Sequence, residues 1–410
     1  MPVDIEKFFR ASCPYRQLNL GNGKFQYQPD YVPVRGKQIL AAIQHPIVSA
    51  SLRQPTCQLF SGLIGSGKTR ELRHLQSQLE QQSFQTVFID ASPVVETADW
   101  ARGAELLLFI ALSISQVLKQ NHYDIQTPFF KQLVQIQRED RRNLRTSLKQ
   151  YLGQHNGQVV NAINADLLAP AKKYLKRQGK QDWVIIVDEL DRLDSRRLPS
   201  GRSQPEAFFT DQGQLLRQLD CHVIYTFPLA LKFSDEYELM VQGFGYEPHI
   251  LPMIPTQNRE GGNCEAGMAL LRQIVLARAF PELDSAQRLQ HVDEVFDTVE
   301  TLDRLCRISG GHPRKLLSLL AISLQRAEEL PLSRNDIDCV ITSEMEELCL
   351  VVTDTEWQSL VWVSQQLPID QEELRTLCRS LFVLEYNDDQ GRWFNVNPLL
   401  AEAEKFQAFC

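Results

Sequence analysis

The chain has 410 residues, of which 43% are hydrophobic and 23% charged, and its formal net charge is −8. This balance is typical of a globular protein with two or three domains. We expect no membrane span and no signal peptide, because no run of about 18 apolar residues occurs and the start lacks a basic segment followed by an apolar one. Nine cysteines without a C-x-x-C pair argue against a zinc site and favour reduced thiols in the cytoplasm.

The hydrophobic pattern predicts strands that alternate with helices. Residues 1–30 are rich in polar and aromatic residues and are expected to form an irregular arm. The helices and strands that follow are expected at 37–52 (helix), 58–60 (strand), 70–82 (helix), 86–90 (strand), 183–187 (strand), 206–219 (helix), 222–225 (strand), 229–240 (helix) and 249–253 (strand). This alternation favours a doubly wound α/β fold with a parallel sheet.

The remaining segments complete a four-part organisation. After the arm, a P-loop type α/β core is expected at 31–262, with a helical insertion at 94–178. A helical lid is expected at 263–348. Residues 349–410 are expected to form a small winged-helix-like domain, with two short helices and a β-hairpin that turns at 387–391.

The strongest motif is a glycine-rich loop between the first strand and the next helix. It matches G-x-x-x-x-G-K-[ST] in full, in the strand–loop–helix context that the motif requires. Its backbone amides would cradle phosphates, the lysine would contact the β- and γ-phosphates, and the threonine hydroxyl would bind Mg²⁺. The residues are Gly62, Leu63, Ile64, Gly65, Ser66, Gly67, Lys68 and Thr69.

Two acidic residues close the apolar strand that begins at Trp183. Asp188 at the carboxyl end of that strand can reach a magnesium ion beside Thr69. Glu189 can polarise an attacking water as a general base. The alternative is a helix N-cap followed by a solvated glutamate. No N-K-x-D guanine-reading motif follows, which favours adenine and predicts ATP with Mg²⁺ as the ligands.

The sequence resembles AAA+/STAND ATPases, especially origin-recognition-like bacterial members. The resemblance covers about 31–400 and depends on three segments: Gly62–Thr69, Ile186–Arg192 and Ser309–Leu316. It implies an ATPase that uses the nucleotide as a conformational switch, in a bacterial conflict or regulatory system.

The resemblance also implies roles for single residues. Thr226 matches a sensor-1 residue that reads the γ-phosphate, although a strand-end cap is the alternative. Arg314 matches a sensor-2 arginine of the lid, with a surface arginine as the alternative. Pro313 is expected near the adenine, and Val34 and Arg35 match the segment that lines the base pocket.

One feature departs from ring-forming AAA+ proteins, which place an arginine that acts in trans after sensor 1. Residues 226–258 contain no arginine. We therefore expect slow hydrolysis, because such a finger can raise the rate by orders of magnitude. The cations that could substitute for it are Arg192, Arg196, Arg197, Arg202 and Arg217.

Charge is unevenly distributed. Residues 131–180 hold eleven Lys/Arg and three Asp/Glu, whereas residues 344–410 hold four and thirteen. The basic stretch, including Arg141, Arg142 and Arg145, suits either a solvated helical face or a nucleic-acid surface. The acidic tail favours contact with protein over DNA. We therefore expect a protein partner or self-association, with a DNA-associated regulator and a non-hydrolysing scaffold as alternatives.

Overall fold

The computed structural model describes residues 3–13, 39–50, 54–92, 103–137, 144–154, 158–194 and 196–409. These residues form two compact units. Unit 1 comprises Met1–Ile39, Leu63–Gly67 and Leu251–Cys410, and unit 2 comprises Leu40–Gly62 and Lys68–Ile250. The domain boundaries expected at residues 262 and 348 stay a prediction, since the expected lid and tail both lie within unit 1.

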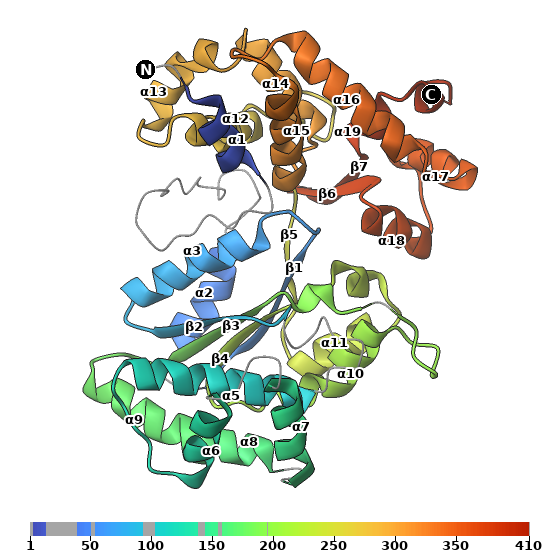
Figure 1. Ribbon diagram of the computed structural model, residues 1–410. Helices are drawn as coiled ribbons and strands as arrows, with labels where there is room; N and C mark the ends of the chain where they lie inside the picture. The colour runs from blue at the N-terminus through green and yellow to red at the C-terminus, as the bar shows by residue number, and fades with distance from the viewer. Residues whose placement is uncertain are drawn as a thin grey trace. The chain divides into compact units, whose positions relative to one another are not determined.

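Unit 2 is built on a parallel sheet, which confirms the predicted α/β fold. The sheet has five strands in the order β2-β3-β4-β1-β5 (Figure 1). Strand β4 lies between β1 and β3 and pairs with both in parallel. The strands are β1 (Cys57–Gly62), β2 (Gln85–Asp90), β3 (Trp183–Asp188), β4 (His222–Thr226) and β5 (His249–Leu251).

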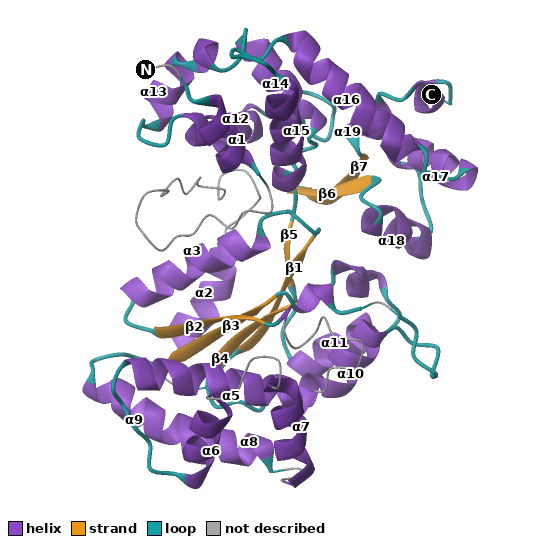
Figure 2. Ribbon diagram, viewed as in Figure 1, coloured by secondary structure: helices purple, strands orange, loops and turns teal. Residues whose placement is uncertain are grey.

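Helices cover both faces of this sheet. Helix α3 packs against β2 and β3, and α5 packs against β2 on the opposite face (Figure 2). All six residues of β1 and of β3 are buried, as a strand covered on both faces requires. The helices of this unit are α2 (Ile39–Ala50), α3 (Lys68–Gln81), α5 (Gly103–Gln120), α6 (Pro128–Gln137), α7 (Leu144–Gln154), α8 (Val159–Ala162), the π-helical turn η2 (Ile163–Leu168), α9 (Ala169–Arg177), the 3-10 turn η3 (Leu190–Arg192), α10 (Gln204–Leu216), the 3-10 turn η4 (Leu229–Phe233) and α11 (Tyr237–Phe244).

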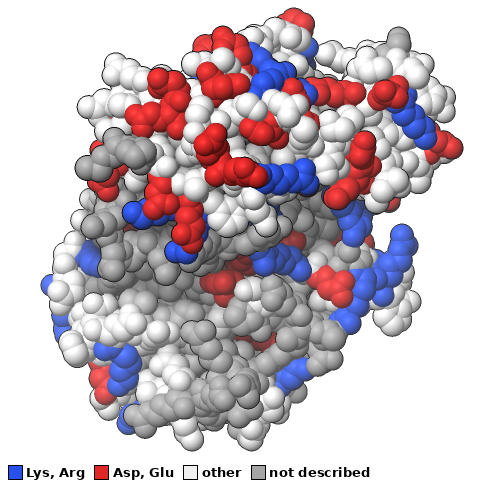
Figure 3. All heavy atoms as spheres, turned by 45° about the horizontal axis from the view of Figure 1, so that its top comes forward, with Lys and Arg blue, Asp and Glu red and all other residues white. Residues whose placement is uncertain are grey.

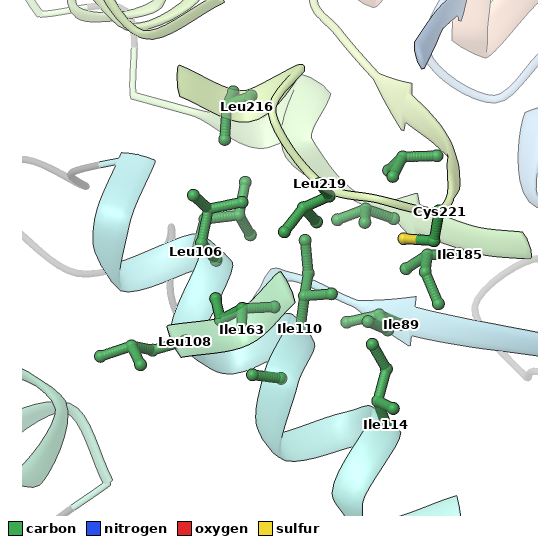
Figure 4. Packing of buried hydrophobic residues seen from close by; sticks show 14 of the residues in the cluster. Ile89, Leu106, Leu108, Ile110, Ile114, Ile163, Ile185, Leu216, Leu219 and Cys221 are labelled. Carbon is green, nitrogen blue, oxygen red and sulfur yellow. The ribbon is translucent and has the colours of Figure 1, made fainter. Parts of the chain in front are cut away.

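The predicted helical insertion forms one side of the unit 2 core. Side chains of α5 such as Leu106, Ile110 and Ile114 belong to the same cluster of buried residues as Ile89 and Ile185 of the strands (Figure 4). By length and composition α5 could cross a membrane, but 61% of its apolar window is buried inside the structure. Its apolar residues therefore have a packing role that explains their number.

Unit 1 has a separate core made largely of helices. Buried residues of α12, α14, α15 and α16 form one cluster, which α1 joins through Phe8. After the helices come two further short helices and the antiparallel pair β6–β7, as the sequence predicts. The elements are α1 (Ile5–Ser12), α12 (Glu265–Ala279), α13 (Ser285–Gln290), the 3-10 turn η5 (Val292–Glu294), α14 (Val299–Ile308), α15 (Pro313–Arg326), α16 (Arg334–Cys349), α17 (Asp354–Ser364), α18 (Gln371–Arg379), β6 (Val383–Asp388), β7 (Gly391–Val396), α19 (Pro398–Ala401) and α20 (Glu404–Gln407).

The expectation of an irregular arm is wrong for its first part. Asp4 caps helix α1, because its carboxylate accepts hydrogen bonds from the amides of Glu6 and Lys7. Phe8 is 1% exposed, and α1 packs against α12 and α15. A helix of eight residues is marginal alone, so these tertiary contacts stabilise it.

Two other segments differ from expectation. The helix predicted at 229–240 is divided into η4 and α11, with Ser234 in an extended conformation between them. The strand predicted at 249–253 ends at Leu251. Beyond it, the amide of Met253 donates to the carbonyl oxygen of Glu385 in β6 at 2.9 Å. The amide of Met253 is thus paired with the hairpin and not with the large sheet.

Candidate functional site

The parallel sheet brings three predicted site residues to one edge, because Gly62, Asp188 and Thr226 are the last residues of β1, β3 and β4. Phe60 of β1 lies opposite Thr226 of β4, and Val187 of β3 lies opposite Tyr225 of the same strand. The carboxyl ends of these strands therefore meet, and ligands of open α/β sheets bind outside such ends. The loop after β1 and the acidic end of β3 both begin at this edge.

Lys68, the first residue of α3, is held by two oxygen atoms in unit 2. Its Nζ donates to the carbonyl oxygen of Gly62 at 3.0 Å. The same atom lies 2.9 Å from Oδ2 of Asp191, and the two side chains are 7% and 10% exposed. Asp191, for which the sequence predicts no role, is thus a counter-charge of the predicted phosphate-binding lysine.

Asp188 has a buried carboxylate, of which only one oxygen has a hydrogen-bond partner within the described residues. The side chain is 2% exposed, and Oδ1 accepts a hydrogen bond from the amide of Glu189 at 2.9 Å. Burial raises its pKa, while a hydrogen bond from Thr69 opposes the rise. Oδ2 is buried and has no hydrogen-bond partner within the described residues. A buried carboxylate oxygen beside a hydroxyl is a donor set that suits Mg²⁺.

Glu189 adopts a conformation that is uncommon for its residue type. Its φ of 68° places it in the left-handed region, where a side chain is strained. Burial, and then the charge of Asp188, raise its pKa to about 7, against the opposing effect of Arg192. Arg192 forms an ion pair with its carboxylate. A glutamate that titrates near neutrality suits the predicted role of general base.

Thr226 has a structural role that can be seen directly. Its hydroxyl oxygen accepts a hydrogen bond from the amide of Leu190 at 3.0 Å, and the residue is fully buried. This contact fixes the turn that follows Glu189, which corresponds to the capping alternative. The hydroxyl retains its proton as a donor, so the sensor-1 role stays a prediction.

The middle of the phosphate loop, Leu63–Gly67, belongs to unit 1. The amide of Ser66 donates to the carbonyl oxygen of Leu63 at 3.1 Å. Gly65 and Gly67 have φ values of +85° and +99°, which a side chain rarely adopts. The local turn therefore depends on glycine at both positions.

His312 contacts this loop, a role that the sequence does not predict. Its Nε2 lies 2.8 Å from the carbonyl oxygen of Ile64, and its Nδ1 accepts from the amide of Lys315 at 3.0 Å. Its position before Pro313 was the only available signal, since proline commonly begins a helix and the preceding residue then caps it.

Pro313 and Arg314 begin helix α15 in the same unit. Pro313 takes the first helical position, as its missing amide hydrogen allows. Arg314 lies close to the loop, because a Cβ added to Gly65 would be 2.9 Å from the Cβ of Arg314. The sensor-2 role of Arg314 and the adenine contact of Pro313 stay predictions.

Other predicted features fall partly outside the described residues. Val34 and Arg35 lie outside them, as do Arg141 and Arg142. On α9, Lys172 forms ion pairs with Asp182 and Asp220. Part of the predicted basic surface is thus neutralised locally.

Within the described ranges, no group of three or more His, Cys, Asp or Glu residues could hold a metal ion. A magnesium site at Asp188 would therefore need oxygen ligands from a nucleotide and from water, as such sites usually do.

Comparisons with known proteins give distant similarities only. No family model and no curated protein matches the chain. The ORC2 protein of Aeropyrum pernix, solved as ADPNP and ADP complexes, is 13% identical, with 95% of this chain and 97% of that chain covered and a TM-score of 0.44. Cdc6p from Pyrobaculum aerophilum is 12% identical, with 100% and 98% covered and a TM-score of 0.43. The Walker-type ATPase paby2304 of Pyrococcus abyssi is 11% identical, with 90% and 95% covered and a TM-score of 0.41.

Proposed function

We propose that this protein binds ATP with Mg²⁺, hydrolyses it slowly and uses the bound state as a conformational switch. The observation that carries the proposal is the buried carboxylate of Asp188. Its Oδ2 lacks a hydrogen-bond partner within the described residues, and its neighbour Thr69 belongs to the predicted phosphate loop. A buried carboxylate oxygen without a hydrogen-bond partner is unfavourable, so a divalent cation at Oδ2 would stabilise the site.

The residues divide the binding of ATP between them. Asp188 and Thr69 would hold the metal, which would neutralise charge on the phosphates. Lys68 would exchange its contact with Asp191 for one with the β- and γ-phosphates. The backbone amides of the loop would donate hydrogen bonds to the remaining phosphate oxygens.

Hydrolysis would depend on Glu189. Its pKa of about 7 lets it remain a base at neutral pH and still take a proton from water. The ion pair with Arg192 would have to yield before the carboxylate could contact a water. That requirement and the missing arginine at 226–258 both support a low turnover rate.

The switch would act through the glycine turn Ser309–His312 and helix α15, because this segment contacts the phosphate loop within unit 1. Arg314 would sense the γ-phosphate, and the hairpin β6–β7 would respond through the turn. Partner binding or self-association would follow if the ATP and ADP states expose different surfaces, because only differential affinity can shift such an equilibrium. We extend the proposal to a bacterial regulatory or conflict system on the resemblance alone.

The central experiment compares wild type with Glu189→Gln. Glutamine keeps the size of the side chain but cannot act as a base. We expect ATP affinity within about threefold of wild type in calorimetry and turnover at least about 100-fold lower. Glu404→Gln, at an exposed position of α20, is the matched control and should change neither quantity. Equal, measurable turnover in wild type and Glu189→Gln would reject Glu189 as the base, and no turnover in either would favour the non-hydrolysing scaffold.

The switch has its own measurement. The mass of the protein in solution is compared in ADP and in a slowly hydrolysed ATP analogue. A change in mass supports nucleotide-gated assembly, and equal masses favour a monomeric switch.

A second candidate is a DNA-associated regulator. Lys173, Lys176 and Arg177 on α9 are exposed, which favours contact with phosphates. On the face in Figure 3, however, acidic side chains are widespread over the helices of unit 1. DNA binding that weakens steeply with salt, and is lost when these three cations are replaced by glutamate, would favour this candidate.

A further inference from the structure

His312 has both ring nitrogens committed to named partners. Its Nδ1 accepts a hydrogen bond from the amide of Lys315, which caps helix α15. An acceptor nitrogen carries no proton, so in the neutral ring the proton sits on Nε2. Nε2 therefore donates to the carbonyl oxygen of Ile64, 2.8 Å away. Burial lowers the pKa of His312 to about 4, which keeps the ring neutral near pH 7.

The contact with Ile64 also orients the next amide. The peptide group between Ile64 and Gly65 is planar and trans, so its C=O and N–H point in opposite directions. When the carbonyl oxygen is drawn towards His312, the amide hydrogen of Gly65 is directed away from the ring. This amide belongs to the set that would cradle phosphates.

Close packing supports the same pairing. A Cβ added to Gly65 would lie 2.4 Å from Cε1 of His312, closer than real Cβ atoms come to a neighbour. The phosphate-loop pattern allows any residue at position 65, so the motif does not explain this glycine. The imidazole ring of His312 explains it, together with the φ of +85°.

The turn that presents His312 is itself braced within unit 1. A Cβ at Gly311 would lie 1.6 Å from the carbonyl oxygen of Ile254, so only glycine fits there. The hydroxyl of Tyr386 in β6 donates to the carbonyl oxygen of Gly310 at 2.8 Å. The ring is therefore carried by a rigid segment, and its hold on the loop does not depend on a mobile surface side chain.

We propose that His312 is a positioning residue for nucleoside triphosphate binding, which acts through the Ile64 carbonyl to aim the Gly65 amide at the phosphates. The inference rests on the proposed function and deepens it. It places the effect of His312 on nucleotide affinity rather than on the chemical step, because the ring contacts the loop and no reacting atom.

Two substitutions separate the two bonds of the ring. His312→Asn keeps a good helix cap, since asparagine is favoured at that position, but its shorter side chain does not reach Ile64. His312→Gln places an amide nitrogen near the position of Nε2 and so keeps the donor, while it loses the favoured cap. The pair is matched because each variant retains one bond and removes the other.

The first measurement is ATP affinity by calorimetry, with turnover under saturating ATP. We expect His312→Asn to bind ATP about fivefold to tenfold more weakly, the effect of one neutral hydrogen bond, with kcat unchanged. His312→Gln should bind within about twofold of wild type. The melting temperature without nucleotide should fall in both variants, because each loses one hydrogen bond of the ring.

The second measurement needs no nucleotide. Amide hydrogen exchange is followed in the segment 62–69 of the protein alone. We expect faster exchange in His312→Asn than in wild type or His312→Gln, because the loop loses its anchor.

The outcomes are distinct. Wild-type affinity in His312→Asn, or equal weakening in both variants, would overturn the positioning role. If wild type binds no ATP, the proposed function fails, and the exchange experiment still decides whether His312 anchors the loop.

Discussion

The phosphate loop is held at two points by contacts of different kinds. In unit 2, Lys68 is held by the carboxylate of Asp191 and by the carbonyl oxygen of Gly62. In unit 1, the carbonyl oxygen of Ile64 is held by the neutral ring of His312. The first contact is mainly electrostatic and the second is a single directional hydrogen bond.

The difference between the charged and the neutral contact indicates which of the two a bound nucleotide would change. In the proposed function a triphosphate would compete directly with Asp191 for Lys68, because both are anions. It has no such competition with the His312 bond, which instead sets the direction of a backbone amide. We therefore expect the charged contact to tune the strength of binding and the neutral contact to set the geometry.

The largest effect should come from a substitution in the glycine turn that carries His312. Gly311→Ala combines a φ of +71° with a clash against the Ile254 carbonyl oxygen. We expect the free energy of unfolding to fall by about 4 kcal/mol, measured by urea denaturation. Gly261→Ala is the control in the same unit, since its φ is +88° but nothing lies within 4 Å of the added Cβ. Equal losses in the two variants would mean that the clash is relieved easily.

The second largest effect should come from the removal of the Lys68 cation. Lys68→Ala should weaken ATP binding at least about 100-fold, roughly 3 kcal/mol, because a buried charge contact with the phosphates is lost. Calorimetry of the folded variant gives the affinity. Lys7→Ala serves as the control, since the Lys7 side chain is 84% exposed. Unchanged affinity in Lys68→Ala would discard the assignment of the site.

Acid should weaken unit 1 through His312. Burial lowers the pKa of His312 to about 4, below the value of about 6.5 in the unfolded chain. Between these values the unfolded chain binds the extra proton, so the stability present above pH 6.5 is lost as the pH falls towards 4. We expect wild type to lose roughly 2–3 kcal/mol more than His312→Asn between pH 7 and pH 4, in urea denaturation.

His222 provides the internal check on that experiment. Burial lowers the pKa of His222 to about 4 as well, so part of the acid sensitivity should persist in His312→Asn. If the free energy of unfolding of His312→Asn depended on pH as that of wild type does, His312 would not titrate as its burial requires.

The smallest effect concerns the counter-charge of Lys68. Asp191→Asn removes an anion that a triphosphate must displace, so ATP should bind about threefold to tenfold more tightly, which is about 1 kcal/mol. Titration calorimetry in low salt is the measurement, because screening reduces the effect. Weaker binding in Asp191→Asn would indicate that Asp191 orients Lys68 for the nucleotide instead of competing with it.

Much of the fold could be predicted because its signals are local. The apolar run Trp183–Val187 indicated a buried strand, and the strand β3 is buried throughout. Lys68 and Asp188 could be predicted as site residues because a glycine loop and an acidic strand end are short patterns with a direct chemical meaning. Helix α1 was missed because its stability depends on Phe8, whose burial depends on distant helices.

The sequence by itself determined the parallel sheet, the helical insertion and the chemistry expected of residues 62–69 and 188–189, because these depend on periodicity and on neighbours along the chain. Only the tertiary structure showed that Asp191 holds Lys68 and that His312 holds Ile64. Ile64 and His312 are 248 positions apart in the chain, and no local pattern records which side chain will meet which backbone carbonyl. That pairing is set by the packing of the glycine turn, where glycine at Gly311 is required by the closeness of the Ile254 carbonyl oxygen.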